Sequence, residues 1–173
     1  MKFPPPEAHK RASTSPPWGR GWPAGLATVF GIGWFPFAPG TVASAAATIL
    51  GGLLALLGWQ AVLMAALVAT AIGIYVCGVY ARTIGVYDPS ECVLDEMAGQ
   101  WFALVPVAAG RRASDWVLFA VAFFLFRLFD IWKPWPISAA ETLSGGIGIM
   151  MDDVVAGLFA GALVYAAMAT GWL

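Results

Sequence analysis

Acidic residues are scarce in this chain, and most of them gather in three short segments that border long apolar stretches. The chain has ten Asp and Glu residues, and the three segments hold four, one and two of them: Asp88, Glu91, Asp95 and Glu96, then Asp130, then Asp152 and Asp153. Arg127 and Lys133 flank the middle segment. Ionised groups near a bilayer are costly and are rare unless they have a function. Carboxylates bind hard metal ions and cations bind phosphates, so the pattern indicates a metal site beside an anionic, phosphorylated lipid.

The pair Asp95-Glu96 stands where an apolar helix is expected to begin, and the positive end of a helix dipole favours carboxylates there. The pair Asp152-Asp153 repeats this arrangement before the last apolar stretch. A glycine follows each pair, Gly99 and Gly157, and a small residue lets another helix approach closely. Helix-start acids without further function are the alternative. The repetition favours an oxygen-rich pocket, and the predicted Mg²⁺ ligands are Asp95, Glu96, Asp152 and Asp153.

Arg127, Asp130 and Lys133 recur at helical spacing at the end of another apolar stretch. The simple alternative is an ion pair between Arg127 and Asp130, with Lys133 reaching toward the membrane surface. Arg127, however, lies inside the apolar run and needs an anionic partner, for which phosphate offers bidentate geometry. We therefore predict that Arg127 and Lys133 bind phosphate and that Asp130 is a further metal ligand or a base.

The segment Pro39-Gly40-Thr41 precedes a further apolar stretch. A glycine near a helix start exposes backbone amides to an anion, and Thr41 is suited to cap the helix. An ordinary helix cap is the alternative. We predict that Gly40 and Thr41 help to bind phosphate, and we keep Asp88 and Glu91 as additional candidates for the site.

Histidine and cysteine chemistry is disfavoured, which leaves the carboxylates and a metal. The only histidine, His9, lies in a Pro-rich terminal stretch, and Cys77 and Cys92 form no metal-binding pair. A carboxylate beside a metal can orient or deprotonate water. Attack by an aspartate itself, forming an aspartyl-phosphate, is the alternative. The predicted catalytic residues are Asp95, Asp130 and Asp152.

The composition predicts an all-α integral membrane helical bundle. The chain is 60% hydrophobic and only 11% charged, with a mean hydropathy of +0.78, whereas soluble domains are about one quarter charged. A net charge of −1 gives no case for a nucleic-acid partner. We expect a flexible basic, Pro-rich tail at 1–20 and one membrane-embedded catalytic domain at 21–173.

About five apolar helices are expected, with an interfacial or re-entrant segment at 25–37, a short surface helix at 138–144 and a flexible glycine hinge at 145–148. The expected apolar helices cover 41–57, 61–81, 95–109, 116–132 and 154–173. With the basic tail in the cytoplasm, counting the crossings places every acidic segment at the cytoplasmic face. The sequence therefore predicts a charged site at one face of the membrane.

Four segments together resemble the phosphatidylglycerophosphatase A family of bacterial membrane enzymes: GIGWFPFAPGT (31–41), GVYDPSECVLDEMAGQW (85–101), FRLFDIWKPWPI (126–137) and GGIGIMMDDVVAG (145–157). The resemblance implies Mg²⁺-dependent hydrolysis of phosphatidylglycerophosphate to phosphatidylglycerol at the cytoplasmic face of the inner membrane, with the phospholipid and membrane lipids as partners. The family pattern does not include Glu91. It falls on Asp88, Asp95, Glu96, Arg127, Asp130, Lys133, Asp152 and Asp153.

Two other membrane functions that use carboxylates fit the sequence less well. An ion-coupled transporter would use the carboxylates as a cation site, but it predicts acids near the middle of the bilayer rather than at helix ends. A CDP-alcohol phosphotransferase would need a longer aspartate signature, which is not present around Asp152.

Overall fold

The computed structural model describes residues 21–110 and 115–172, and within them it is helical, with no strand. The all-α prediction is thus confirmed, while the tail at 1–20 lies outside the described residues. The elements are α1 (Trp22–Ala27), the 3₁₀ helix η3 (Val29–Trp34), α2 (Pro39–Ala55), α3 (Trp59–Ile84), α4 (Leu94–Ala109), α5 (Trp116–Trp132), α6 (Ile137–Glu141) and α7 (Gly146–Ala169).

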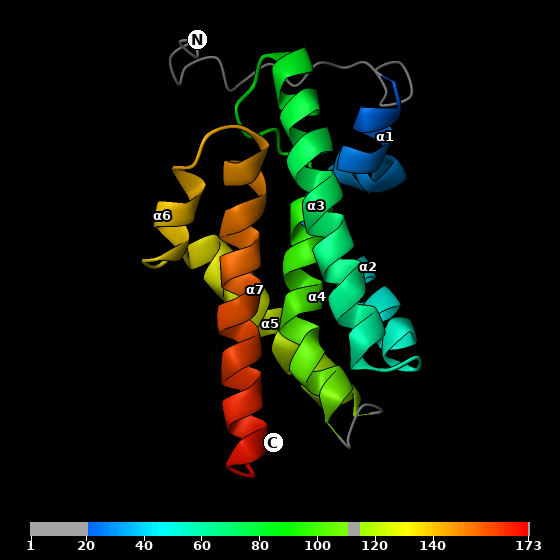
Figure 1. Cartoon of the computed structure of the whole chain (residues 1–173), viewed down its shortest axis with the longest axis vertical. Helices are drawn as coiled ribbons and strands as arrows, with labels where there is room; N and C mark the ends of the chain where they lie inside the picture. Colours follow the sequence, from blue (N-terminus) through cyan, green and yellow to red (C-terminus); the bar gives the residue numbers. More distant parts are fainter. Residues whose placement is uncertain (1–20, 111–114, 173) are drawn as a thin grey trace.

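Helix α4 is the centre of the bundle, because it contacts α2, α3, α5 and α7. Figure 1 shows α3, α4 and α7 running beside one another, with α1 and α6 toward one end and the C-terminus at the other. The short α1 and η3 pack on α3 and α2. The N-terminal apolar segment therefore forms short helices packed against the bundle, and its place at a membrane interface stays a prediction.

Two glycines bring α4 and α7 into backbone contact. A Cβ on Gly157 would clash with the carbonyl oxygen of Gly99, and a Cβ on Gly99 would lie 2.5 Å from the carbonyl oxygen of Asp153. The prediction that these small residues permit close helix approach is confirmed. The contact holds the first turns of α4 against the acidic part of α7.

A methyl group at this crossing is expected to separate the two helices. Gly157→Ala should lower the stability of the detergent-solubilised protein by about 1–3 kcal/mol, since the added carbon meets rigid backbone. Gly52→Ala in α2 is the matched control, because its Cβ would meet Phe119 at an ordinary 3.7 Å. That control should be neutral or stabilising by up to about 1 kcal/mol. Equal thermal unfolding of the two variants would contradict the role given to Gly157.

Helix α7 begins earlier than predicted, and the expected hinge is wrong. Gly145 is the N-cap with φ 66°, but Gly146 and Gly148 already belong to the helix. A Cβ on Gly146 would clash with the carbonyl of Ile74 in α3, and one on Gly148 with the carbonyl of Leu143. The glycines thus serve close packing rather than flexibility. In consequence, the pair Asp152-Asp153 lies beyond the first turn of α7, not at its start.

Helix α2 also begins earlier than predicted. Ala38 is the N-cap, with a left-handed φ of 47°, and Pro39 occupies the first helical position, where its missing N–H costs nothing. Thr41 is therefore not the cap. Gly40 and Thr41 instead lie in the first turn, where backbone N–H groups have no carbonyl partner within the helix.

The surface supports a membrane-embedded bundle. Helices α3 and α7 are long and apolar enough to cross a bilayer, and α2 is a shorter apolar helix; the count of five spanning helices stays a prediction. Large apolar side chains face outward along several helices, as expected for contact with lipid tails. Examples are Leu67 and Ile72 of α3, Phe124 of α5, and Leu158 and Leu163 of α7.

Candidate active site

Three carboxylates from two helices meet at the crossing of α4 and α7. One oxygen each from Asp95, Glu96 and Asp153 lies within 4.8 Å of the others. Asp95 and Asp153 are buried and Glu96 is half-buried. Asp95 and Glu96 stand in the first turn of α4, as predicted. Carboxylates this close repel one another, and either a bound cation or protonation of one of them relieves the repulsion.

The donor set fits a hard divalent metal ion. All three groups offer carboxylate oxygens, which such ions prefer. Oε2 of Glu96 is buried and has no hydrogen-bond partner in the described part of the chain. A buried carboxylate oxygen without a partner is costly, and a metal ion would satisfy it. The fourth predicted ligand, Asp152, is not a member of this group.

Arg127 lies near the C-terminal end of α5, the end that is predicted to face the cytosol. Its Nη1 lies 2.5 Å from Oδ2 of Asp130 and donates to the hydroxyl of Ser44 at 3.5 Å. The ion pair weighed as the simple alternative therefore exists. A Cβ on Gly40 would lie 3.0 Å from Cδ of Glu96 and 3.3 Å from Nη1 of Arg127. The first turn of α2 thus meets both the acidic cluster and the guanidinium, where the predicted anion site requires it.

Lys133 turns away from the axis of α5. It is the C-cap of that helix, in the left-handed conformation with φ 46°, so it does not extend the helical face of Arg127 and Asp130. Its Nζ donates to Asp152 Oδ2 at 2.7 Å and pairs with Glu141 at 3.2 Å. Burial lowers the pKa of Lys133, but the bonds to Asp152 and Glu141 outweigh burial and leave the pKa above its usual value. The Lys133 ammonium is therefore held beside Asp152 of α7 and Glu141 of α6.

Asp88 stands at the margin of the site, in the loop between α3 and α4. It is exposed, and it follows Tyr87, whose hydroxyl donates to the carbonyl of Leu143. Burial raises the pKa of Tyr87, and the charges of Asp88, Glu141 and Asp152 raise it further. Asp88 therefore belongs to the electrostatic surroundings of the Lys133 pair.

Glu91 is not brought to the carboxylate cluster. It lies half-buried in a turn before α4, and its backbone carbonyl packs against Gly33 of η3. Glu91 does not share a helical face with Asp95, because α4 begins only at Leu94.

Two polar residues near the site were missed by the sequence interpretation. Glu141 pairs with Lys133 from the five-residue α6, and nothing in its local sequence indicates this. Gln100 is completely buried in α4. Its position four residues after Glu96 could have marked it, since such residues share a helical face.

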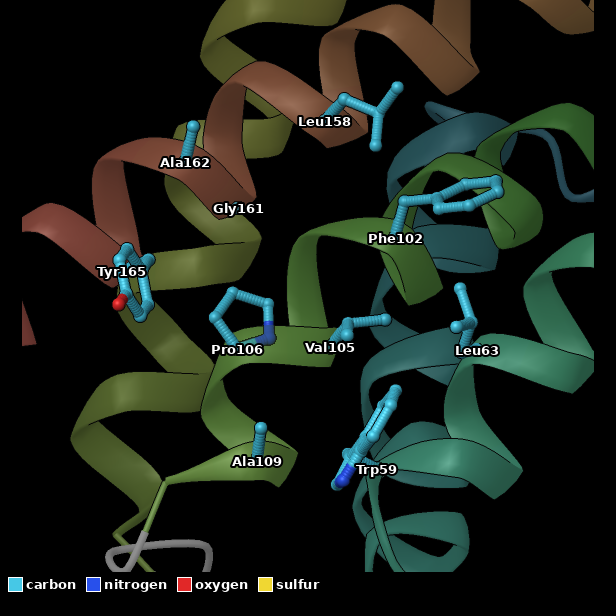
Figure 2. Close-up of a pocket in the computed structure, with 10 residues that line it drawn as sticks. All are labelled: Trp59, Leu63, Phe102, Val105, Pro106, Ala109, Leu158, Gly161, Ala162 and Tyr165. Atoms are coloured by element: carbon cyan, nitrogen blue, oxygen red, sulfur yellow. The ribbon is translucent and has the colours of Figure 1, made fainter.

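The pocket in Figure 2 has a different character. It has a volume of about 510 Å³ and lies between α3, α4 and α7, with Trp59 and Leu63 on one side and Tyr165 on another. Its α4 residues, Phe102 to Ala109, belong to the second half of the helix, away from the acids at the start. Its lining is apolar, so it contains none of the groups needed for phosphate chemistry.

Comparisons with known proteins identify the relatives of the chain. The family model described as phosphatidylglycerophosphatase A matches residues 25–168. Phosphatidylglycerophosphatase A of Escherichia coli K12 is 37% identical over 159 residues, covering 91% of this chain and 87% of that protein. The Haemophilus influenzae protein of the same name is 41% identical, covering 82% and 85%.

One further relative carries a different name. A Bacteroides thetaiotaomicron protein, named as a candidate phosphatidylinositol-3-phosphatase, is 42% identical over 147 residues, covering 82% of this chain and 91% of that protein. No solved structure matches the chain.

Proposed function

The chain belongs to the phosphatidylglycerophosphatase A family, and from this premise we propose that it hydrolyses phosphatidylglycerophosphate to phosphatidylglycerol and phosphate in phospholipid biosynthesis. One observation carries the proposal: Glu96 of the carboxylate cluster and the guanidinium of Arg127 both meet the first turn of α2 at Gly40. The proposed metal-binding group and the proposed anion-binding group thus stand side by side. The transporter alternative has no support among the relatives.

The proposed cofactor is Mg²⁺, held by Asp95, Glu96 and Asp153. When bound, it would supply charge to polarise a phosphoryl oxygen and acidify a water molecule. Asp152 as a fourth ligand stays a prediction, since its Oδ2 accepts the hydrogen bond of Lys133.

The chain's own residues would bind the phosphate and move the proton. Arg127 is held in place by Asp130 and Ser44, so its guanidinium is oriented before substrate arrives. We propose that it grips the phosphate oxygens, together with the free amides of Gly40 and Thr41. Lys133 would add a second positive charge. Asp130 is the proposed base: it accepts a proton from water as the water oxygen bonds to phosphorus and the phosphorus–oxygen bond to glycerol breaks, and it returns the proton to the departing glycerol oxygen.

We propose that the site faces the cytoplasm from the bacterial inner membrane. The carboxylate cluster and Arg127 come from the start of α4, the last turns of α5 and the first half of α7. Exposed tryptophans stand instead at the start of α3, at the start of α5 and just after the end of α7: Trp59, Trp116 and Trp172. Such an aromatic girdle is typical of a membrane interface.

A second apolar pocket is the proposed place for an acyl chain of the substrate. It has a volume of about 450 Å³ between η3, α2, α3 and α4. Its lining includes Leu94 and Met97, which flank the acids of α4 in sequence, whereas the pocket of Figure 2 is remote from them. A lipid whose phosphate is at the carboxylates could therefore place a chain here.

Filling this pocket is expected to weaken the binding of long-chain substrate. Ala65→Phe in α3 should raise KM several-fold for a long-chain phosphatidylglycerophosphate, with little effect on a dibutanoyl analogue, because about 0.8 kcal/mol is lost for each displaced CH₂. Ala162→Phe, in the lining of the remote pocket, is the matched control and should leave both KM values unchanged. Equal effects of the two variants would contradict the assignment.

The function is tested by the choice of substrate. The purified protein in mixed micelles is given phosphatidylglycerophosphate or phosphatidylinositol 3-phosphate, and the lipid product is identified by mass spectrometry. We expect phosphatidylglycerol and phosphate from the first lipid, with a higher kcat/KM than for the second. Turnover of phosphatidylinositol 3-phosphate alone would reject the proposed substrate and retain the reaction class.

A further inference from the structure

Gln100 has a polar side chain in the buried interior of the bundle. No hydrogen bond among the described residues gives this side chain a role in the fold. It is 0% exposed, in the interior of α4. Neither its Nε2 nor its Oε1 has a hydrogen-bond partner among the residues that the structure describes. A buried amide with both ends unpaired is destabilising, and in native proteins it calls for an explanation.

Two more buried polar atoms without partners belong to the proposed active site. They are Oε2 of Glu96 and Nε of Arg127. Together with the amide of Gln100 they make two donors and two acceptors. This is the complement of a bound water molecule, which typically makes about three hydrogen bonds to buried polar groups.

Helical geometry places Gln100 on the same face of α4 as Glu96. Glu96, Gln100 and Leu104 form one row of α4 at four-residue spacing. The ends of the row both touch α2: Glu96 meets Gly40, and Leu104 meets Gly51. Leu104 also packs in one cluster with Leu118 and Ala122 of α5. The row therefore lies between α2 and α5, the helix that carries Arg127.

We propose that Gln100 is a positioning residue for Glu96, acting through a water molecule bound between the amide, Oε2 of Glu96 and Nε of Arg127. The inference rests on the proposed function, because it takes Glu96 as a metal ligand. Carboxylates that ligate metals are in turn held by hydrogen bonds, which fix their orientation. Gln100 would thus aim one oxygen of Glu96 at the metal and couple it to the phosphate-binding arginine.

The test separates positioning from structure. Gln100→Met keeps the volume and removes both polar atoms, and Leu104→Met, one turn further along the same row, is the matched control. Binding of Mn²⁺ is measured by electron paramagnetic resonance of the detergent-solubilised protein, and thermal unfolding is measured in chelator. We expect Gln100→Met to weaken Mn²⁺ binding about 10-fold or more and to leave the unfolding temperature in chelator unchanged or higher. The control should change neither quantity.

Unchanged Mn²⁺ binding in a stable Gln100→Met protein would overturn the proposal. Gln100→Leu repeats the test with a side chain that lacks sulfur, and Mn²⁺ binding is read in whichever variant keeps wild-type stability. Loss of stability in both variants would also overturn it, because the amide would then serve the fold. The binding measurement needs no substrate. A wild-type protein that binds Mn²⁺ but releases no phosphate would reject the proposed function and leave the inference on Gln100 standing.

Discussion

Asp153→Asn is expected to lower phosphate release from phosphatidylglycerophosphate by more than about 100-fold. Residues that only support the metal ligands typically cost about 10- to 100-fold in activity when they are mutated, and a ligand should cost more. Asp153 supplies the only carboxylate of the three-acid cluster that comes from α7. An amide offers a neutral oxygen in place of a charged one and weakens the binding of a hard divalent cation. Raising the Mg²⁺ concentration should restore part of the activity, because the defect is in metal binding.

Asp115→Asn is the matched control for this variant. Asp115 caps α5 by accepting from the backbone N–H of Val117, at the end of that helix away from Arg127. Asparagine caps helices about as well as aspartate, so activity and stability should stay near the wild-type values. An Asp153→Asn protein with more than about a tenth of wild-type activity at low Mg²⁺ would contradict its role as a ligand.

Arg127→Lys is expected to lower kcat/KM about 100-fold or more, since an oriented charged donor to a reacting oxyanion contributes about 10²–10³. The charge is kept, so Asp130 still has a cation nearby. What is lost is the planar pair of nitrogens that can bind Asp130, Ser44 and a phosphate at once. The loss should appear in kcat as well as KM, because charge on the phosphoryl oxygens changes during the reaction.

Two comparisons isolate the effect of Arg127. Arg82→Lys changes an exposed arginine in the last turn of α3 and should leave kinetics unchanged. Arg127→Met should in addition destabilise the protein by about 3–5 kcal/mol, because it leaves the partly buried Asp130 without its cation. Near-normal kcat in Arg127→Lys would contradict the requirement for a planar guanidinium at the phosphate.

Local signals predicted some elements closely and others poorly. The limits of α5 agree with the prediction at both ends, because Asp115 caps one end and Lys133-Pro134 stops the other. The start of α7 was placed eight residues late. Glycines at 145–148 are typical of a hinge in isolation, and only packing against α3 and Leu143 makes them helical.

The candidate site likewise contains some residues that the sequence predicted and others that it did not. The two acidic pairs and the glycines after them predicted a meeting of Asp95, Glu96, Asp152 and Asp153, and all of these except Asp152 belong to the cluster. Lys133 bonds to Asp152 and pairs with Glu141 because the chain turns after α5. Helical periodicity in the sequence does not predict this turn. Gln100 has no local signal beyond its spacing, and its importance appears only through the burial of its amide.

The most direct test of the central claim is to locate the metal. Crystals of the protein grown with Mn²⁺ and a phosphate analogue give an anomalous signal at the manganese absorption edge. We expect a peak bounded by carboxylate oxygens of Asp95, Glu96 and Asp153, with the analogue between it and Arg127. A peak at Asp88 or Glu91 instead, or no peak at the α4–α7 crossing, would contradict the account.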